Sequence, residues 1–145
     1  MLTNRSTTLK YDGHSSEPIR LDNRIGQGDP LSMVLYQYYN ADLLDIPRGK
    51  NEDTLAYIDN TIMLATAETF NKAHTKLADM MGREGGVLEW SKDHNSSLEY
   101  SKLALIDFAH RSSGKLRTTL QLPQISIKPL SSMKYLGVIV NQNLN

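Results

Sequence analysis

The chain has 145 residues, of which 39% are hydrophobic and 22% charged, and its 16 basic side chains balance its 16 acidic ones. This composition suits one soluble globular domain, and zero net charge gives no overall attraction to nucleic acid or anionic membranes. Cysteine is absent, which excludes disulfide frameworks, thiolate zinc sites and cysteine nucleophiles. The start of the sequence lacks an apolar leader and no stretch is long enough to cross a bilayer, so we expect an intracellular protein, nuclear or cytoplasmic.

The N-terminal part predicts a β-hairpin followed by a helix. Residues 7–11 and 18–21 have strand character, and turn formers separate them. A helix should begin at Pro30, because Asp29 can cap free N–H groups and proline in the first turn loses no needed donor. It is expected to reach about Leu44, with one buried stripe formed by Leu31, Val34, Leu35, Tyr38, Ala41 and Leu44.

The sequence Tyr57-Ile58-Asp59-Asn60 separates two apolar runs, residues 54–58 and 61–65. Two runs of β-forming residues joined by an Asp-Asn pair predict a hairpin, because both residue types tolerate the positive φ of a tight turn. The carboxylate of Asp59 should then lie at an exposed tip. Taken alone, such a stretch is more often a plain turn than a functional site.

A second helix is expected over residues 68–83, where apolar side chains again recur at helical spacing. Glu68 would complement the positive end of its dipole, and His74 beside the apolar stripe is expected to be structural. Residues 87–97 are expected to be irregular, with Trp90 anchoring them against the core.

The C-terminal part predicts strands over residues 98–109, 120–127 and 133–140. A basic loop precedes the second strand and is usually only solvated; phosphate contact by Arg111, Lys115 and Arg117 is the alternative. Together the elements indicate an α+β fold in which an antiparallel sheet packs on two helices.

Three motifs stand in a definite order along the chain: Gln27-Gly28-Asp29-Pro30-Leu31-Ser32, then Tyr57-Ile58-Asp59-Asn60, then Lys134-Tyr135-Leu136-Gly137-Val138. In this order they resemble the palm subdomain of reverse transcriptases, the RNA-directed DNA polymerases, of non-LTR (LINE-type) retrotransposons. The likeness covers nearly all of residues 1–145. It implies a palm-like fold and, in the intact enzyme, nucleotidyl transfer that uses an RNA template, a DNA primer and dNTPs.

The resemblance also implies roles for individual residues. Gln27 and Gly28 would lie beside the templating base and the incoming nucleotide. Asp59 would bind Mg²⁺ at the catalytic tip, next to Asn60, and Lys102 would protonate the pyrophosphate leaving group. The primer end would be held by Lys134, Tyr135, Leu136 and Gly137. Two Mg²⁺ ions can neutralise the charge that develops during this transfer, and hard anionic oxygens are the ligands that hold them.

The sequence departs from the family in ways that bear on activity. Asn60 is neutral where the family has a second aspartate, and the family's upstream aspartate motif is absent, since Asp12 and Asp22 do not follow an apolar strand. Gly26 and Asp29 replace Pro and Ser, and fingers, thumb and endonuclease are missing. We therefore expect a partial reverse transcriptase domain that is inactive alone. The alternative is a non-catalytic retroelement remnant that acts at most as a weak nucleic-acid or protein-binding module.

Overall fold

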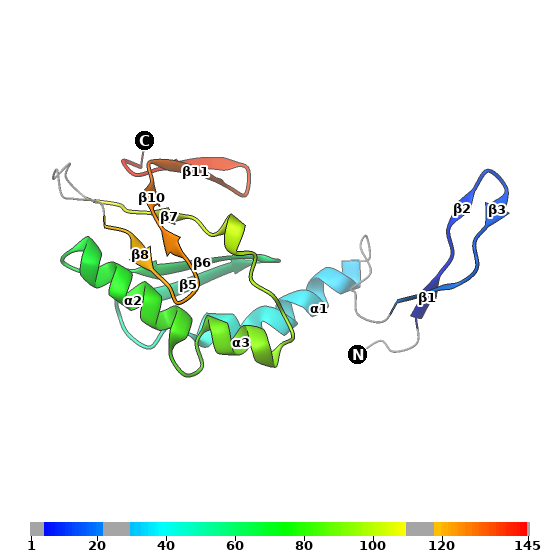
Figure 1. Ribbon diagram of the computed structural model, residues 1–145, viewed down its shortest axis with the longest axis horizontal. Coiled ribbons are helices and arrows are strands. Elements are labelled where there is room, and N and C mark those ends of the chain that lie inside the picture. Colours follow the sequence, from blue (N-terminus) through cyan, green and yellow to red (C-terminus); the bar gives the residue numbers. More distant parts are fainter. Residues whose placement is uncertain (1–4, 22–29, 110–117, 145) are drawn as a thin grey trace. The chain divides into compact units, whose positions relative to one another are not determined.

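The computed structural model describes residues 5–21, 30–109 and 118–144 of the chain (Figure 1). The chain divides into two compact units, Met1–Tyr39 and Asn40–Asn145. Helices and short strands occur together, which confirms the mixed α+β class.

The first unit contains two antiparallel strand pairs. β1 (Arg5–Thr7) pairs with β4 (Ile19–Leu21), and between them β2 (Lys10–Tyr11) pairs with β3 (His14–Ser15). The chain reverses at Asp12 and Gly13, whose φ angles of +46° and +80° are those of a two-residue type I′ hairpin loop. The expected N-terminal hairpin is therefore confirmed, with its turn at the Asp-Gly pair.

The predicted first helix changes character along its length. α1 (Pro30–Asn40) begins at the expected proline, and the chain continues as a 3₁₀ helix, η1 (Ala41–Asp45). Leu43 and Ile46 are buried in the second unit. All six side chains expected on a buried stripe are instead exposed: Leu31, Val34, Leu35, Tyr38, Ala41 and Leu44. Periodicity detects an apolar helix face, but it does not reveal whether another element covers that face.

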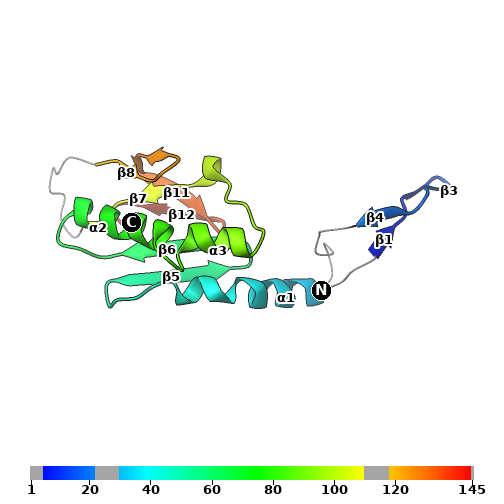
Figure 2. The same ribbon diagram turned by 60° about the horizontal axis from the view of Figure 1, so that its bottom comes forward.

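The central hairpin of the second unit consists of β5 (Glu52–Tyr57) and β6 (Asn60–Ala65), paired antiparallel from Glu52↔Ala65 to Tyr57↔Asn60. The helix α2 (Phe70–Gly82) follows, and the Thr69 hydroxyl caps it by accepting a 3.3 Å hydrogen bond from the Lys72 backbone N–H. α2 packs against β6, and Figures 1 and 2 show it beside the β5–β6 hairpin. Both elements were predicted from the sequence.

The segment expected to be irregular after α2 contains a helix, α3 (Val87–Asp93), so that expectation was wrong. The carboxylate of Glu89 accepts a 2.6 Å hydrogen bond from the Gly85 N–H and stabilises the helix start. Gly86 is required there, because a Cβ atom on it would lie 2.7 Å from the Met80 carbonyl oxygen. A helix this short offers too few turns for its periodicity to be recognised.

The remaining strands are shorter than expected. Residues 98–109 contain only η2 (Tyr100–Lys102) and β7 (Leu105–Ile106), and residues 120–127 form a hairpin of β8 (Leu120–Gln121) and β9 (Ser126–Ile127). Residues 133–140 likewise belong to a hairpin, with strands β11 (Ser132–Tyr135) and β12 (Val138–Asn141).

Antiparallel pairing is confirmed for five of the six strand pairs in the described ranges, but these strands do not form the one sheet that was expected. The strands of the described ranges pair only in twos, and one pair, β10 (Pro129–Leu130) with β7, is parallel. The apolar runs were recognised correctly, but the tight turns that divide them were not. The loop of the β11–β12 hairpin, for example, begins with a leucine, which is not a turn-forming residue type.

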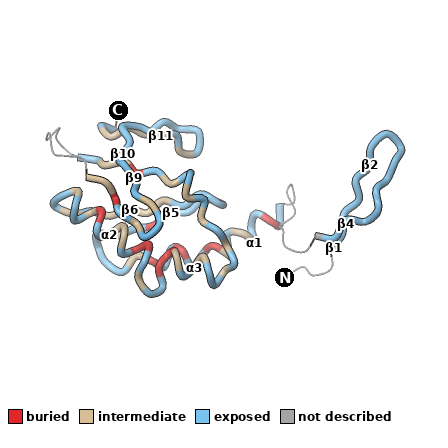
Figure 3. The backbone as a smooth tube through the Cα atoms, in the orientation of Figure 1, coloured by how far each residue is buried: buried red, intermediate tan, exposed pale blue. Residues whose placement is uncertain are grey.

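The core of the second unit lies where α2 and α3 meet the β5–β6 hairpin (Figure 3). Its buried apolar side chains are Leu43, Ile46, Met80, Met81 and Val87. Trp90 packs against this cluster and stacks on His94 with ring centroids 4.4 Å apart, so the expected anchoring role of Trp90 is confirmed. Met80 and Met81 of α2 also belong to this core, so they fix the position of the β5–β6 hairpin relative to the helix.

One charged pair joins the end of α2 to the start of β5. The Arg83 guanidinium lies 2.8 Å from the Glu52 carboxylate, and the two side chains are only 11% and 12% exposed. Arg83 also donates to the Asp79 carboxylate at 3.0 Å and to the Ile46 carbonyl oxygen. The hydrogen bond from Arg83, assisted by the Arg48 N–H, lowers the pKa of Glu52, although burial opposes the shift.

Candidate functional site

The tip of the β5–β6 hairpin is a two-residue loop formed by Ile58 and Asp59, because Tyr57 and Asn60 are the last paired residues. The hairpin itself and its exposed Asp59 are as predicted. The residue with positive φ differs from the prediction. Ile58 has a φ of +54°, whereas the positive angle was expected in the Asp59-Asn60 pair. Asn60 is the first residue of β6 rather than a loop residue. A β-branched side chain is unfavourable at positive φ, so this tip is strained.

A buried amide lies beneath the strained loop. The side-chain Nδ2 of Asn40 donates a 3.0 Å hydrogen bond to the Ile58 carbonyl oxygen, and Asn40 is 5% exposed. The bond fixes the backbone of the loop residue that precedes Asp59. The sequence does not reveal this role of Asn40, because no local pattern connects residues 18 positions apart in the chain.

The two polar residues of the tip interact with each other. Asn60 Nδ2 donates to Asp59 Oδ1 at 3.0 Å, and both residues are exposed. The neutral residue at position 60 therefore orients the carboxylate of Asp59 and occupies part of its hydrogen-bonding capacity. Replacing it by aspartate would exchange this attraction for repulsion between neighbouring carboxylates, unless a cation lay between them.

The donor set at this tip does not by itself make a magnesium site. Mg²⁺ requires near-octahedral oxygen ligation, usually from one or two carboxylates together with water and phosphate oxygens. Over residues 5–21, 30–109 and 118–144, no group of three or more His, Cys, Asp or Glu side chains could hold a metal ion. Asp59 can thus contribute one carboxylate, and further anionic ligands must come from elsewhere.

The other residues singled out in the sequence lie on separate elements. Lys102 ends the 3₁₀ helix η2 and is exposed. The β11–β12 hairpin carries Lys134 and Tyr135 at the end of its first strand, and its loop is Leu136-Gly137, with φ angles of +48° and +88°. Residues outside the described ranges include Gln27, Gly28, Arg111, Lys115 and Arg117.

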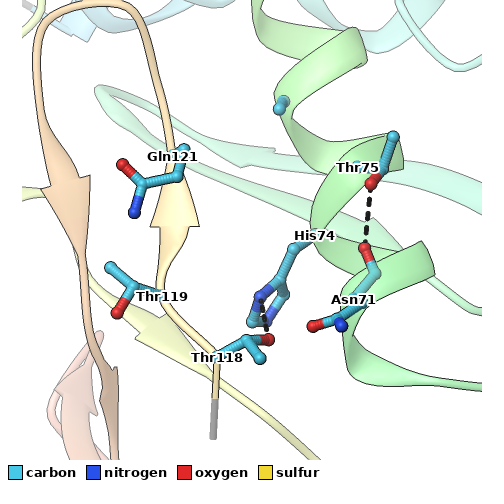
Figure 4. Close-up of a pocket in the computed structure, with 7 residues that line it drawn as sticks. Asn71, His74, Thr75, Thr118, Thr119 and Gln121 are labelled. Carbon is cyan, nitrogen blue, oxygen red and sulfur yellow. Dashed lines mark hydrogen bonds between the residues drawn. The ribbon is translucent and has the colours of Figure 1, made fainter.

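A second polar cluster was not foreseen as a site. His74 Nε2 lies 2.8 Å from Asp107 Oδ1, and His74 Nδ1 lies 3.3 Å from Thr118 Oγ1. Figure 4 shows His74 projecting from α2 toward the segment that leads into β8. The partners lie 33 and 44 positions from His74 in the sequence, so no spacing rule could have connected them.

Two further observations bear on function. Among the described residues, no helix has the length and apolar character needed to span a membrane. Comparisons with protein-family models, with curated proteins and with solved structures found no match. The chain's function must therefore be inferred from the geometry of its own residues.

Proposed function

We propose that the chain is a segment of the palm of a non-LTR retrotransposon reverse transcriptase, and that it contributes Asp59 as one Mg²⁺ ligand within a complete polymerase. The observation that carries this proposal is the placement of Asp59. It is exposed at the two-residue tip of a hairpin whose strands are six residues long. An isolated carboxylate on a short, rigid loop suits a ligand that must reach a metal shared with other parts of an enzyme.

The surroundings of the hairpin support this assignment. α2 packs on β6, its residues Met80 and Met81 belong to the core of the second unit, and Asn40 fixes the loop backbone by its hydrogen bond to Ile58. These contacts give the tip a defined position. Preorganised carboxylates are what phosphoryl and nucleotidyl transfer need, because catalysis there depends on positioning and on charge stabilisation.

When bound in an intact enzyme of this class, Mg²⁺ ions activate the primer hydroxyl and neutralise charge on the pyrophosphate oxygens. The contribution of this chain is limited to holding Asp59 in place and orienting it through the Asn60 amide. One carboxylate cannot hold a pair of ions. The isolated chain should therefore show no primer extension on an RNA template with dNTPs and either Mg²⁺ or Mn²⁺.

The proposal can be tested with a chimera, in which residues 52–65 of this chain replace the matching hairpin of an active LINE-type polymerase. Template-dependent extension by the chimera should depend on Asp59, so Asp59→Asn should lower the rate by roughly 10²–10³-fold, as loss of a charge-stabilising group does. Asp53→Asn is the matched control, because Asp53 is an exposed acidic residue of the same hairpin. Equal rates for the two variants would show that Asp59 is a turn residue and would refute the proposal.

A further inference from the structure

The cluster formed by His74, Asp107 and Thr118 joins three separate parts of the second unit. His74 belongs to α2, Asp107 follows β7, and Thr118 precedes β8. The side chains of His74 and Asp107 are 6% and 9% exposed, and their atoms Nε2 and Oδ1 are 2.8 Å apart. Burial excludes competing water, so these contacts fix the orientation of the imidazole ring.

The hydrogen-bond partners determine which ring nitrogen carries the proton. An ionised carboxylate only accepts hydrogen bonds, so the Nε2 atom that faces Asp107 carries hydrogen. In the neutral imidazole, Nδ1 is then an acceptor, and it faces the Thr118 hydroxyl at 3.3 Å. Asp107 Oδ2 is buried and has no hydrogen-bond partner among the described residues, while Asp107 Oδ1 lies 2.8 Å from the imidazole.

The order hydroxyl, imidazole, carboxylate is the arrangement that activates an alcohol as a nucleophile. The imidazole accepts the hydroxyl proton, and the carboxylate keeps the ring in the required tautomer and stabilises the imidazolium that forms. The 3.3 Å separation of Thr118 Oγ1 and His74 Nδ1 is at the loose end of such contacts, as is common before a substrate is bound.

A cavity gives a substrate access to this group. Thr118 and His74 both line a cavity of about 280 Å³, together with Asn71, Thr75, Thr119 and Gln121 (Figure 4). The amides of Asn71 and Gln121 are hydrogen-bond donors that can meet a carbonyl oxygen. Among the described residues that line the cavity, none is an acid, a lysine or an arginine. The volume and the neutral polar lining suit a small uncharged acyl group.

We propose that Thr118 is a nucleophile toward small neutral carboxylic esters, with His74 as the general base and Asp107 as the residue that positions His74. The Thr118 oxygen forms a bond to the ester carbonyl carbon while its proton passes to His74 Nδ1. The ester carbon–oxygen bond then breaks, and the leaving alcohol takes that proton. Water attacks the acyl-threonine, gives one proton to His74, and releases the carboxylic acid as Thr118 regains its hydroxyl hydrogen. This activity is independent of the polymerase assignment.

The test uses the full chain and a small alkyl fluorophosphonate, which reacts by forming a threonine oxygen–phosphorus bond with loss of fluoride. Peptide mass spectrometry should place the adduct on Thr118. Thr118→Ser should keep the labelling, whereas Thr118→Val and His74→Gln should lower its rate at least about 10²-fold, the usual contribution of a general base. Thr61→Val is the matched control, because Thr61 is an exposed threonine of β6 that is not among the residues lining the cavity. It should label at the wild-type rate.

Hydrolysis of p-nitrophenyl acetate provides a second readout. Release of nitrophenolate by the wild-type chain should exceed release by Thr118→Val and match that of Thr61→Val, with circular dichroism used to confirm that each variant is folded. An adduct only on other residues would overturn the proposal. So would equal labelling of folded Thr118→Val and wild type, and the cluster would then be a structural hydrogen-bond network between α2, β7 and β8.

Discussion

Asn40 Nδ2 donates a 3.0 Å hydrogen bond to the carbonyl oxygen of Ile58, the residue that carries a φ of +54° at the tip of the central hairpin. A buried amide therefore supports the backbone conformation that most L-residues avoid. This relationship links the end of α1 to the loop that presents Asp59, and it explains how a strained turn can persist next to a proposed functional carboxylate.

Removing that support should weaken the second unit. Asn40→Ala deletes the donor to Ile58, and we expect the free energy of unfolding to fall by about 1 kcal/mol, the typical value of an intramolecular hydrogen bond. Urea denaturation followed by circular dichroism measures the change. Asn51→Ala, at an exposed position that precedes β5, is the control and should change stability by less than about 0.5 kcal/mol. Equal effects of the two substitutions would contradict a supporting role for Asn40.

The strain at the tip predicts an unusual response to glycine. In Ile58→Gly the loop keeps its left-handed conformation without the roughly 1–2 kcal/mol that this conformation costs an L-residue, which offsets the greater flexibility of glycine in the unfolded chain. The variant should be as stable as the wild type or more so. Ile62→Gly is the matched comparison, because Ile62 is similarly half-buried and lies within β6. It should lose more than about 1 kcal/mol. A larger loss at position 58 than at position 62 would show that the turn is not strained.

The Arg83–Glu52 pair predicts a dependence of stability on pH. The hydrogen bond from Arg83 lowers the pKa of Glu52 in the folded chain below its usual value of 4.5. A lowered carboxyl pKa stabilises the fold fully above the unfolded-state value, and this stabilisation is lost as the pH falls through the folded-state value. Glu52→Gln should therefore cost about 1.5–3 kcal/mol at pH 7 and much less at pH 3.

Thermal melts at both pH values measure this difference. Glu68→Gln is the control, because Glu68 pairs with Lys72 at 2.7 Å but its side chain is 83% exposed. A surface pair of this kind contributes at most about 1 kcal/mol. A cost for Glu52→Gln that is the same at pH 3 and pH 7 would mean that the pair does not lower the pKa of Glu52.

Nucleic-acid binding by the isolated chain should be weak and strongly dependent on salt. Net charge is zero, so only local basic groups such as Lys102 and Lys134 can displace counterions. Fluorescence anisotropy with a labelled RNA–DNA duplex should give dissociation constants in roughly the micromolar range or weaker, the range of non-specific complexes. A sequence-specific complex that persists at high salt would contradict this expectation.

The sequence was sufficient where local chemistry decides the structure. The apolar periodicity of residues 68–83 predicted α2, and the paired β-forming runs predicted the β5–β6 hairpin. It was insufficient where a residue type that does not favour turns adopts a left-handed backbone conformation. Ile58 and Leu136 adopt positive φ in hairpin loops, although neither residue type signals a turn.

Of the two candidate sites, the sequence locates the hairpin tip but not the His74 cluster. The exposed tip carboxylate of Asp59 follows from its position between two apolar runs, so the sequence locates it. The contact of His74 with Asp107 depends on the packing of α2 near β7, and 33 positions separate the two residues. Periodicity could place His74 near the core, but it could not identify the partners that give its ring a defined tautomer.

We propose that the β5–β6 tip belongs to a polymerase metal site in which Asn60 takes the place of a carboxylate. The direct measurement is the steady-state rate of RNA-templated extension by the hairpin chimera and by its Asn60→Asp version, over a range of Mg²⁺ and Mn²⁺ concentrations. A carboxylate beside a divalent ion interacts far more strongly than an amide oxygen, so Asn60→Asp should raise the rate in Mg²⁺ by roughly 10–10³-fold. In Mn²⁺ the difference in rate between the two chimeras should be smaller, because Mn²⁺ binds nitrogen and oxygen ligands more tightly than Mg²⁺ does. Equal rates for the two chimeras at every metal concentration would contradict the account and would leave Asn60 as a residue of the turn.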